Sequence, residues 1–163
     1  MVAISSRRRP RARAGALARA ALVAVLVIAL DQLTKHTVAT GIAPGAGERV
    51  LPGVRLVHVR NSGVAFSLLS GGGALVLAVT LVALALLIGY LALRPWRRLL
   101  WLPTGLLVGG AIGNLIDRVV SGAVTDFIKL PDWPAFNLAD VAITVGVIAL
   151  VAVLELAGPR KQP

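Results

Sequence analysis

The sequence predicts an all-α integral membrane protein, with four transmembrane helices and a small extracytoplasmic β/loop element. The chain of 163 residues is 57% hydrophobic and only 15% charged. Two long segments, 74–93 and 99–116, contain no charged residue. Uncharged apolar runs of about 18 residues or more are typical of transmembrane helices, because at ~1.5 Å per residue they cross the hydrocarbon layer.

Two further helices complete the set, although polar residues interrupt both. The first contains Arg19 and Asp31, whose side chains can reach toward opposite membrane surfaces. The last reaches spanning length only if it includes Asn137 and Asp140. The four helices are therefore expected at 14–38, 74–93, 99–118 and 137–156.

One membrane domain, at 14–157, accounts for most of the chain. Residues 1–13 are expected to be a basic, disordered cytoplasmic tail, and 158–163 a second cytoplasmic tail. Glycine and proline predict a loop at 40–53. The β-branched residues that follow, at 54–59, predict a strand.

The basic residues indicate how the chain is oriented. A net charge of +10 also suits nucleic-acid binding, but eleven of the 17 Lys and Arg residues gather in three stretches that share one side if four helices span. The positive-inside rule explains this distribution, with both termini in the cytoplasm. We therefore expect membrane lipid, and no nucleic acid, as a partner.

The N-terminal segment has a competing interpretation. Five arginines ahead of an apolar stretch at 20–30 also resemble a secretory signal peptide. That stretch ends in DQLTK (31–35), where a signal peptide would have a small-residue cleavage site. We therefore interpret it as the first transmembrane helix.

Polar residues gather at the predicted outer ends of the helices and in the outer segments. Charge at the mouth of an apolar helix is costly, so such residues indicate function. At the inner ends, Glu155 is the only acid among Arg and Lys. The outer group consists of Asp31, Lys35, Asn61, Asn114, Asp117, Arg118, Asp126, Asn137 and Asp140.

Several members of this group also have a structural explanation. Asp31 and Lys35 have the spacing of a helical i, i+4 ion pair. Asp117 is expected to form a surface charge pair with the arginine that follows it. Asn137 suits a helix N-cap, which would place Asp140 at the third helical position, where the helix dipole favours a carboxylate.

Asp126 and Asp140 suggest a catalytic pair. Two carboxylates about 3 Å apart share one proton, so one acts as general base on a water and the other as acid toward a carbonyl oxygen. This chemistry hydrolyses amides without Ser, Cys or metal. The chain has no cysteine and two histidines that are not spaced as a metal pair, so we expect no metal and no cofactor.

Five blocks of sequence carry a resemblance to a known family, the lipoprotein signal peptidases or signal peptidases II. Their order and their placement on four helices also agree with that family. Taken together, the five blocks are highly specific. They are DQLTK (31–35), NSGVAF (61–66), GGAIGNLIDR (109–118), VTDFI (124–128) and FNLAD (136–140).

The resemblance implies an aspartic endopeptidase of the bacterial cytoplasmic membrane, with its active site near the outer face. Such an enzyme removes the signal peptide from prolipoproteins, immediately before a diacylglyceryl-modified cysteine. Asp126 and Asp140 would be the catalytic pair. Gly63 would let the substrate approach the backbone closely. The residues implied to order the site or bind substrate are Asp31, Lys35, Asn61, Asn114, Arg118 and Asn137.

Two other classes of function remain open at this point. A small proton-coupled transporter or channel subunit would use Asp31, Asp126 and Asp140 as a relay. It predicts acids spread through the depth of the membrane, whereas this chain places them at one end. A purely structural membrane-assembly protein is the third reading.

The distribution of basic residues predicts the membrane topology. Reporter fusions at Gln162 and within 43–47 should report opposite sides of the membrane, because three spans separate the two positions. Alkaline phosphatase and fluorescent-protein fusions measure this directly. If both positions report the same side, the number of spans between them is even and the common outer level of the polar residues is lost.

Overall fold

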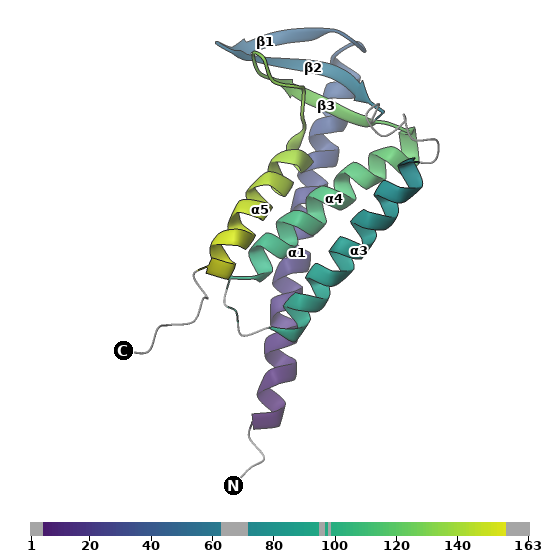
Figure 1. The fold of residues 1–163 in the computed structure, drawn as a ribbon. Coiled ribbons are helices and arrows are strands. Elements are labelled where there is room, and N and C mark those ends of the chain that lie inside the picture. The colour runs from purple at the N-terminus through teal and green to yellow at the C-terminus, as the bar shows by residue number, and fades with distance from the viewer. Residues whose placement is uncertain (1–4, 63–71, 95–96, 98, 156–163) are drawn as a thin grey trace.

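The computed structural model describes residues 5–62, 72–94, 97 and 99–155. In these residues the fold is a bundle of four helices with a three-stranded sheet across one end (Figure 1). The predicted helices and the small β element are therefore confirmed. The helices are α1 (Ser5–Gly41), α3 (Gly72–Leu93), α4 (Trp101–Ser121) and α5 (Leu138–Glu155). The strands are β1 (Gly47–Leu51), β2 (Val54–Asn61) and β3 (Val124–Lys129).

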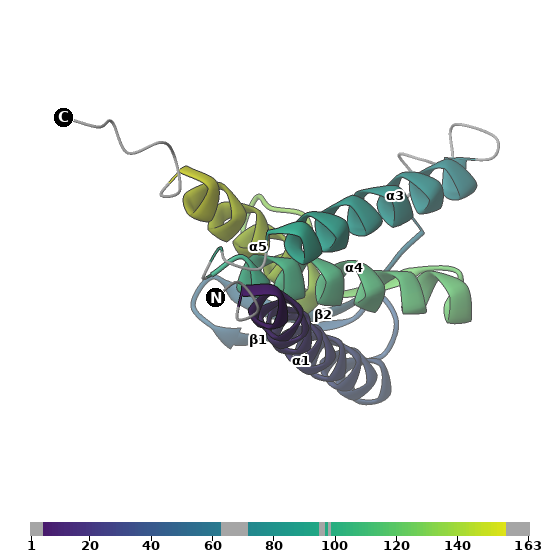
Figure 2. The same ribbon diagram turned by 90° about the horizontal axis from the view of Figure 1, so that it is seen from below.

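Helix α4 contacts each of the other helices, and glycines line its contact faces (Figure 2). A Cβ atom at Gly105 would lie 2.7 Å from the carbonyl oxygen of Ala20 in α1. One at Gly110 would lie 2.5 Å from the carbonyl oxygen of Ala139 in α5. These distances are too short for any side chain, so the helices cross this closely only because the residues are glycines.

The helix boundaries differ from the predicted ones mainly at the N-terminus. Helix α1 begins at Ser5, so the expectation of a disordered tail is wrong for residues 5–13. Arginine and alanine both favour the helix and extend it ahead of the predicted start at residue 14. Helix α4 continues three residues past the predicted end, to Ser121, and is capped by Gly122 (φ 74°), whose N–H donates to the Arg118 carbonyl. A left-handed glycine at this position is a common helix terminator.

The sheet has the order β1-β2-β3, and both pairs of strands are antiparallel. The expectation of a continuous loop at 40–53 is wrong, because β1 lies within it. Gly45 and Gly53, with φ of 79° and 78°, make the turns on either side. The pairing partner of β1 is β2, which continues two residues past the predicted 54–59 to Asn61. Local composition does not reveal such a partner.

Two helical segments are long and apolar enough to cross a membrane, Pro10–Gly41 and Leu138–Glu155. Within α3, the described residues include a shorter apolar helical segment, Thr80–Leu93. Helix α4 carries Asn114, Asp117 and Arg118 near its end, so length and composition alone do not identify it as a span. Large apolar side chains are exposed along α1 and α5, as lipid contact requires, among them Leu22, Val25, Leu26, Val145 and Ile148.

The close crossing of α4 and α5 predicts a strong effect of one methyl group. Gly110→Ala should lower the melting temperature in detergent, because its Cβ would meet a backbone oxygen that cannot move without shifting α5. Overpacking of this kind costs about 1–3 kcal/mol. Gly89→Ala is the matched control, since nothing lies within 4 Å of its Cβ position in α3. Equal melting temperatures for the two variants would contradict this packing.

Candidate active site

Asp126 lies in β3, which meets the bundle at its sheet end. Its side chain is only 3% exposed. Strand pairing places it opposite Val59 of β2. Two residues further along β2, Asn61 donates from Nδ2 to Asp126 Oδ2 at 3.0 Å. The sheet therefore delivers Asp126 together with an amide that holds one of its two oxygens.

Asp140 lies in the first turn of α5 and forms a capping box with Asn137. The Asp140 N–H donates to Asn137 Oδ1 at 2.9 Å, and the Asn137 N–H donates to Asp140 Oδ2 at 3.2 Å. This reciprocal pattern satisfies two N–H groups that the start of a helix otherwise leaves free. The predicted N-cap is thus confirmed, and it aims the half-buried Asp140 carboxylate at the end of the bundle.

Two asparagine side chains join Asp126 to Asp140. Asn137 Nδ2 donates to Asp126 Oδ1 at 2.7 Å and to Asn114 Oδ1 at 3.1 Å. Asn114 Nδ2 in turn donates to Asp140 Oδ1 at 2.8 Å. The two carboxylates, fourteen residues apart in sequence, therefore belong to one hydrogen-bonded network built from β3, α4 and α5.

The surroundings of Asp126 favour its protonated form. Burial raises the pKa of its carboxyl above the ordinary value of 3.8, and the charge of Asp140 adds to this rise. The amides of Asn61 and Asn137, together with the more distant ammonium group of Lys35, pull the pKa in the opposite direction. The net result is a raised pKa. A buried carboxyl of this kind beside a second carboxylate is able to keep a proton that both groups share.

Lys35 forms a second network directly behind this pair. Its ammonium group lies 2.8 Å from Asp31 Oδ2 and 3.0 Å from Asp117 Oδ2, and it donates to Asn114 Oδ1 at 3.0 Å. Asp31 and Lys35 are almost completely buried, at 0% and 4% exposed. Asp31 Oδ1 also accepts the Ala139 N–H at 2.9 Å, which places a negative charge at the N-terminus of α5.

Asp117 is not the surface charge that the sequence suggested. It is buried, pairs with Lys35 and accepts hydrogen bonds from Gln32 Nε2 at 2.9 Å and from the Thr125 N–H at 3.1 Å. The adjacent arginine is therefore not its partner. Because Asp117 lies three residues after Asn114, the helical period already placed both on one face of α4. That spacing was the signal that could have found it.

Two predicted site residues stand apart from these networks. Arg118 is exposed, and its Nη1 donates to the Asn114 carbonyl at 3.2 Å. In the part of the chain that the structure describes, no hydrogen bond joins Arg118 to Asp126 or Asp140. Gly63 lies outside the described residues. Within the described ranges, no group of three or more His, Cys, Asp or Glu residues is arranged to hold a metal ion.

Comparisons with known proteins agree on one family. Residues 23–156 match the family Peptidase_A8, described as signal peptidase (SPase) II. The lipoprotein signal peptidase of Moorella thermoacetica is 47% identical over 131 residues, which cover 79% of this chain and 87% of that one. The enzyme of the same name from Paraburkholderia phymatum is 46% identical over 145 residues, covering 84% and 87%. A bacterial membrane enzyme solved at 1.9 Å by the in meso method superposes with a TM-score of 0.78, at 35% identity, covering 86% and 94%.

The contacts of Asp117 predict a role in holding β3 to the bundle. Asp117→Asn should lower the free energy of unfolding by about 1–3 kcal/mol, since it removes a charge from a buried, hydrogen-bonded pair. It should also speed amide hydrogen exchange at Thr125, whose N–H the carboxylate holds. Asp132→Asn makes the same change at an exposed turn residue and should do neither. Identical behaviour of the two variants would refute the positioning role.

Proposed function

This chain belongs to the lipoprotein signal peptidase family, the signal peptidases II, and we propose that Asp126 and Asp140 are its catalytic pair. It is an aspartic peptidase, and its reaction is the cleavage of signal peptides from prolipoproteins. The observation that carries the assignment of the pair is the single amide of Asn137. Asn137 Nδ2 donates to the Asp126 carboxyl, and Asn137 Oδ1 accepts the Asp140 N–H. The backbone N–H of Asn137 donates to the Asp140 carboxylate.

The different surroundings of the two carboxyls assign their roles. Asp126 keeps the shared proton, because its burial raises its pKa. Asp140 accepts the Asn114 amide and the backbone N–H of Asn137 at the positive end of α5, an arrangement that suits the base of the pair. Asp140 is therefore the general base toward water, and Asp126 the general acid toward the scissile carbonyl oxygen.

The reaction then proceeds in two steps. Water attacks the carbonyl carbon, its proton passes to Asp140, and the proton of Asp126 passes to the carbonyl oxygen. In the tetrahedral intermediate, Asp140 returns its proton to the amide nitrogen as the C–N bond breaks. Asp126 recovers a proton from one of the two hydroxyl groups as the new carboxyl group forms. Neither step requires a metal ion or a cofactor.

In this proposal, the remaining polar residues position the two carboxyl groups or bind the substrate. Lys35 and Asp31 hold α1, α4 and α5 together behind it, and Asn61 orients Asp126. Arg118 is exposed and lies one helical turn after Asn114, whose carbonyl it contacts, and we assign it to substrate binding. We also assign close backbone approach by the substrate to Gly63, on sequence grounds.

The position of the pair matches a substrate held in a membrane. The family's reaction implies a cut immediately before a diacylglyceryl-modified cysteine, which its lipid anchors at the membrane surface. In the proposed topology four helices span the bacterial cytoplasmic membrane, both termini are cytoplasmic and the sheet end faces outward. The acids of the described chain other than Glu155 gather at that end or in the segments beyond it, whereas a proton relay would need acids through the depth of the membrane.

The paired-carboxylate mechanism predicts that Asp126→Asn and Asp140→Asn each reduce cleavage of a lipid-modified prolipoprotein at least a thousandfold, because groups that act as a unit lose nearly all activity when one is removed. Both variants should insert and unfold like the parent, since asparagine retains the shape of the side chain. Asp132→Asn is the control and should cleave normally. More than a tenth of the parent rate in either folded variant would overturn the assignment.

The pH dependence of cleavage should be bell-shaped and should identify the acid. Activity falls at low pH as the pair takes up a second proton, and at high pH as the pair loses the shared proton. The Asn61 amide lowers the pKa of Asp126, so Asn61→Ala should move the alkaline limb to higher pH. A pH–rate series on a lipidated peptide in detergent measures both limbs. An alkaline limb that stays in place or moves to lower pH would assign the shared proton elsewhere.

A further inference from the structure

Three cations lie side by side across the sheet, at a distance from the catalytic pair. Strand register pairs Arg49 of β1 with Arg55 of β2, and Arg55 with Lys129 of β3. Directly opposed residues of neighbouring antiparallel strands project from the same face, with Cβ atoms about 5 Å apart. Like charges in this position destabilise a sheet. We refer to these three residues as the basic ladder.

In the described part of the fold, no member of the basic ladder forms an ion pair with an acidic side chain. The ion pairs recorded there are both made by Lys35, at the far side of the site. Glu48 is next to Arg49 in β1, but it pairs with Leu56 and so projects from the opposite face. Lys129 Nζ donates to the Trp133 carbonyl at 2.6 Å, which satisfies one hydrogen bond but no charge. The repulsion within the ladder is therefore left for an external anion to relieve.

A recess of about 210 Å³ lies against the ladder. Its wall combines the three cations with apolar and backbone surface, a mixture that suits a charged group attached to an apolar body. The recess is lined by Arg49, Gly53, Val54, Arg55, Lys129, Leu130 and Pro131.

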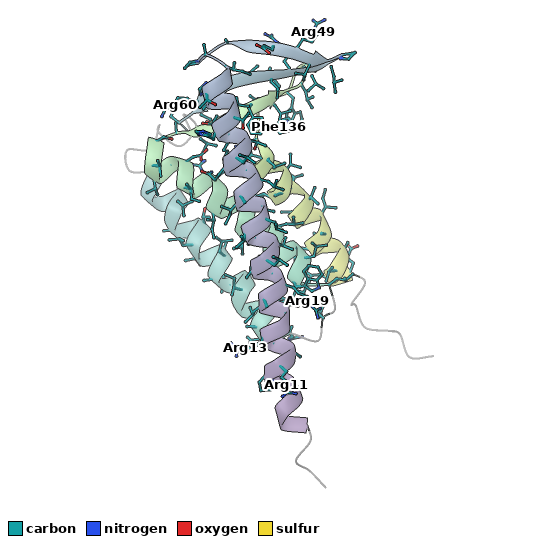
Figure 3. The ribbon with its side chains drawn as sticks, turned by 180° about the vertical axis from the view of Figure 1, so that it is seen from behind. Arg11, Arg13, Arg19, Arg49, Arg60 and Phe136 are labelled. Atoms are coloured by element: carbon teal, nitrogen blue, oxygen red, sulfur yellow. The ribbon has the colours of Figure 1, made fainter. Side chains whose placement is uncertain are left out.

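The position of the ladder in the fold indicates which anion would lie close to it. Arg49 lies at one end of the sheet and Arg60 at the other (Figure 3). The Arg49 end projects sideways past the sheet end of α5, on the side where lipid would surround that helix in the proposed topology (Figures 1 and 3). Leu51 and Trp133, near the ladder in sequence and both more than half exposed, are an apolar and an aromatic side chain of the kind that lies at a membrane surface.

We propose that the basic ladder binds the phosphate of an anionic phospholipid headgroup in the outer leaflet. Arginine forks match phosphate oxygens in pairs, and lysine adds a third charge. Lys129 lies three residues after Asp126 on β3, about 10 Å along the strand, and this odd spacing places the two side chains on opposite faces of the sheet. The bound headgroup would therefore hold the far end of the strand that carries the acid without touching the acid. The proposal rests on the membrane placement above and is independent of the catalytic pair.

Photo-crosslinking of the full chain in lipid nanodiscs tests this proposal. The probes are phosphatidylglycerol and phosphatidylcholine, each with a photoreactive group at the top of one acyl chain. Cross-linked peptides are mapped by mass spectrometry, which separates the sheet from the arginine-rich inner end. We expect the phosphatidylglycerol probe to label 49–55 and 129–133 several-fold more strongly than the phosphatidylcholine probe.

Two substitutions in one strand provide the comparison. Arg55→Gln should reduce phosphatidylglycerol labelling of these segments about fivefold at low salt, the effect of one cation at an anionic surface. Arg60→Gln, in the same strand but outside the ladder, should leave it unchanged, and Arg55→Lys should retain it. The cleavage rate of Arg55→Gln in detergent should equal that of the parent, which shows that the variant is folded.

Three results would overturn the proposal. Equal labelling by the two probes would mean that the ladder recognises no headgroup charge. Displacement of the phosphatidylglycerol probe by millimolar inorganic phosphate would make the ladder a site for free anions. Displacement by a glutamate-rich peptide at similar concentration would make it a polypeptide site. Lipid labelling does not require turnover, so it can also be measured in the inactive Asp126→Asn variant. A failure of the lipid proposal is therefore distinguishable from a failure of the catalytic one.

Discussion

The buried ammonium group of Lys35 holds together the polar end of an otherwise apolar bundle. Removing a charge from water costs several kcal/mol unless partners surround it. Here two carboxylates and one amide oxygen lie within 3.0 Å of the group. The partners belong to α1 and α4, and Asp31 extends the connection to α5 through the Ala139 N–H. Three helices that pack mainly through small apolar contacts are thereby fixed in register where the chemistry is proposed to occur.

Glycine makes this arrangement possible at the crossing itself. A Cβ atom at Gly113 would lie 2.6 Å from Asp31 Oδ2, so any larger residue would displace the carboxylate that Lys35 requires. Gly110, one turn away on the α5 side, lets Ala139 approach the backbone of α4. The glycines of α4 thus serve two purposes, since the close helix packing that they permit also makes room for the buried charges.

The start of α5 has a structural role beside its proposed catalytic one. Asn137 and Asp140 form a capping box, which would be sufficient reason for both residues to be present. The same two side chains also reach Asp126 and Asn114. A cap fixes the position of its side chains, because the helix backbone supplies the partners. The cap therefore prepares the geometry that the proposed base needs, and the two explanations do not compete.

The sequence by itself determined the features that depend on neighbours along the chain. These are the four helices, read from the length of their apolar runs, the Asp31–Lys35 pair, read from its i, i+4 spacing, and the cap at Asn137. Motif resemblance located Asp126 and Asp140, but it did not describe how they are joined.

Contacts between separate elements depend on how the whole chain folds. The tertiary structure made β1 a strand by supplying β2 as its partner, buried Asp117 beside Lys35, and brought Asn114 and Asn137 between the two acids. The first of these contacts joins neighbouring strands of a hairpin, and the other two join elements that lie far apart in the sequence. Their free energy depends on burial and on partners supplied by the whole bundle, whereas local propensity and spacing report only on residues within a few turns of each other.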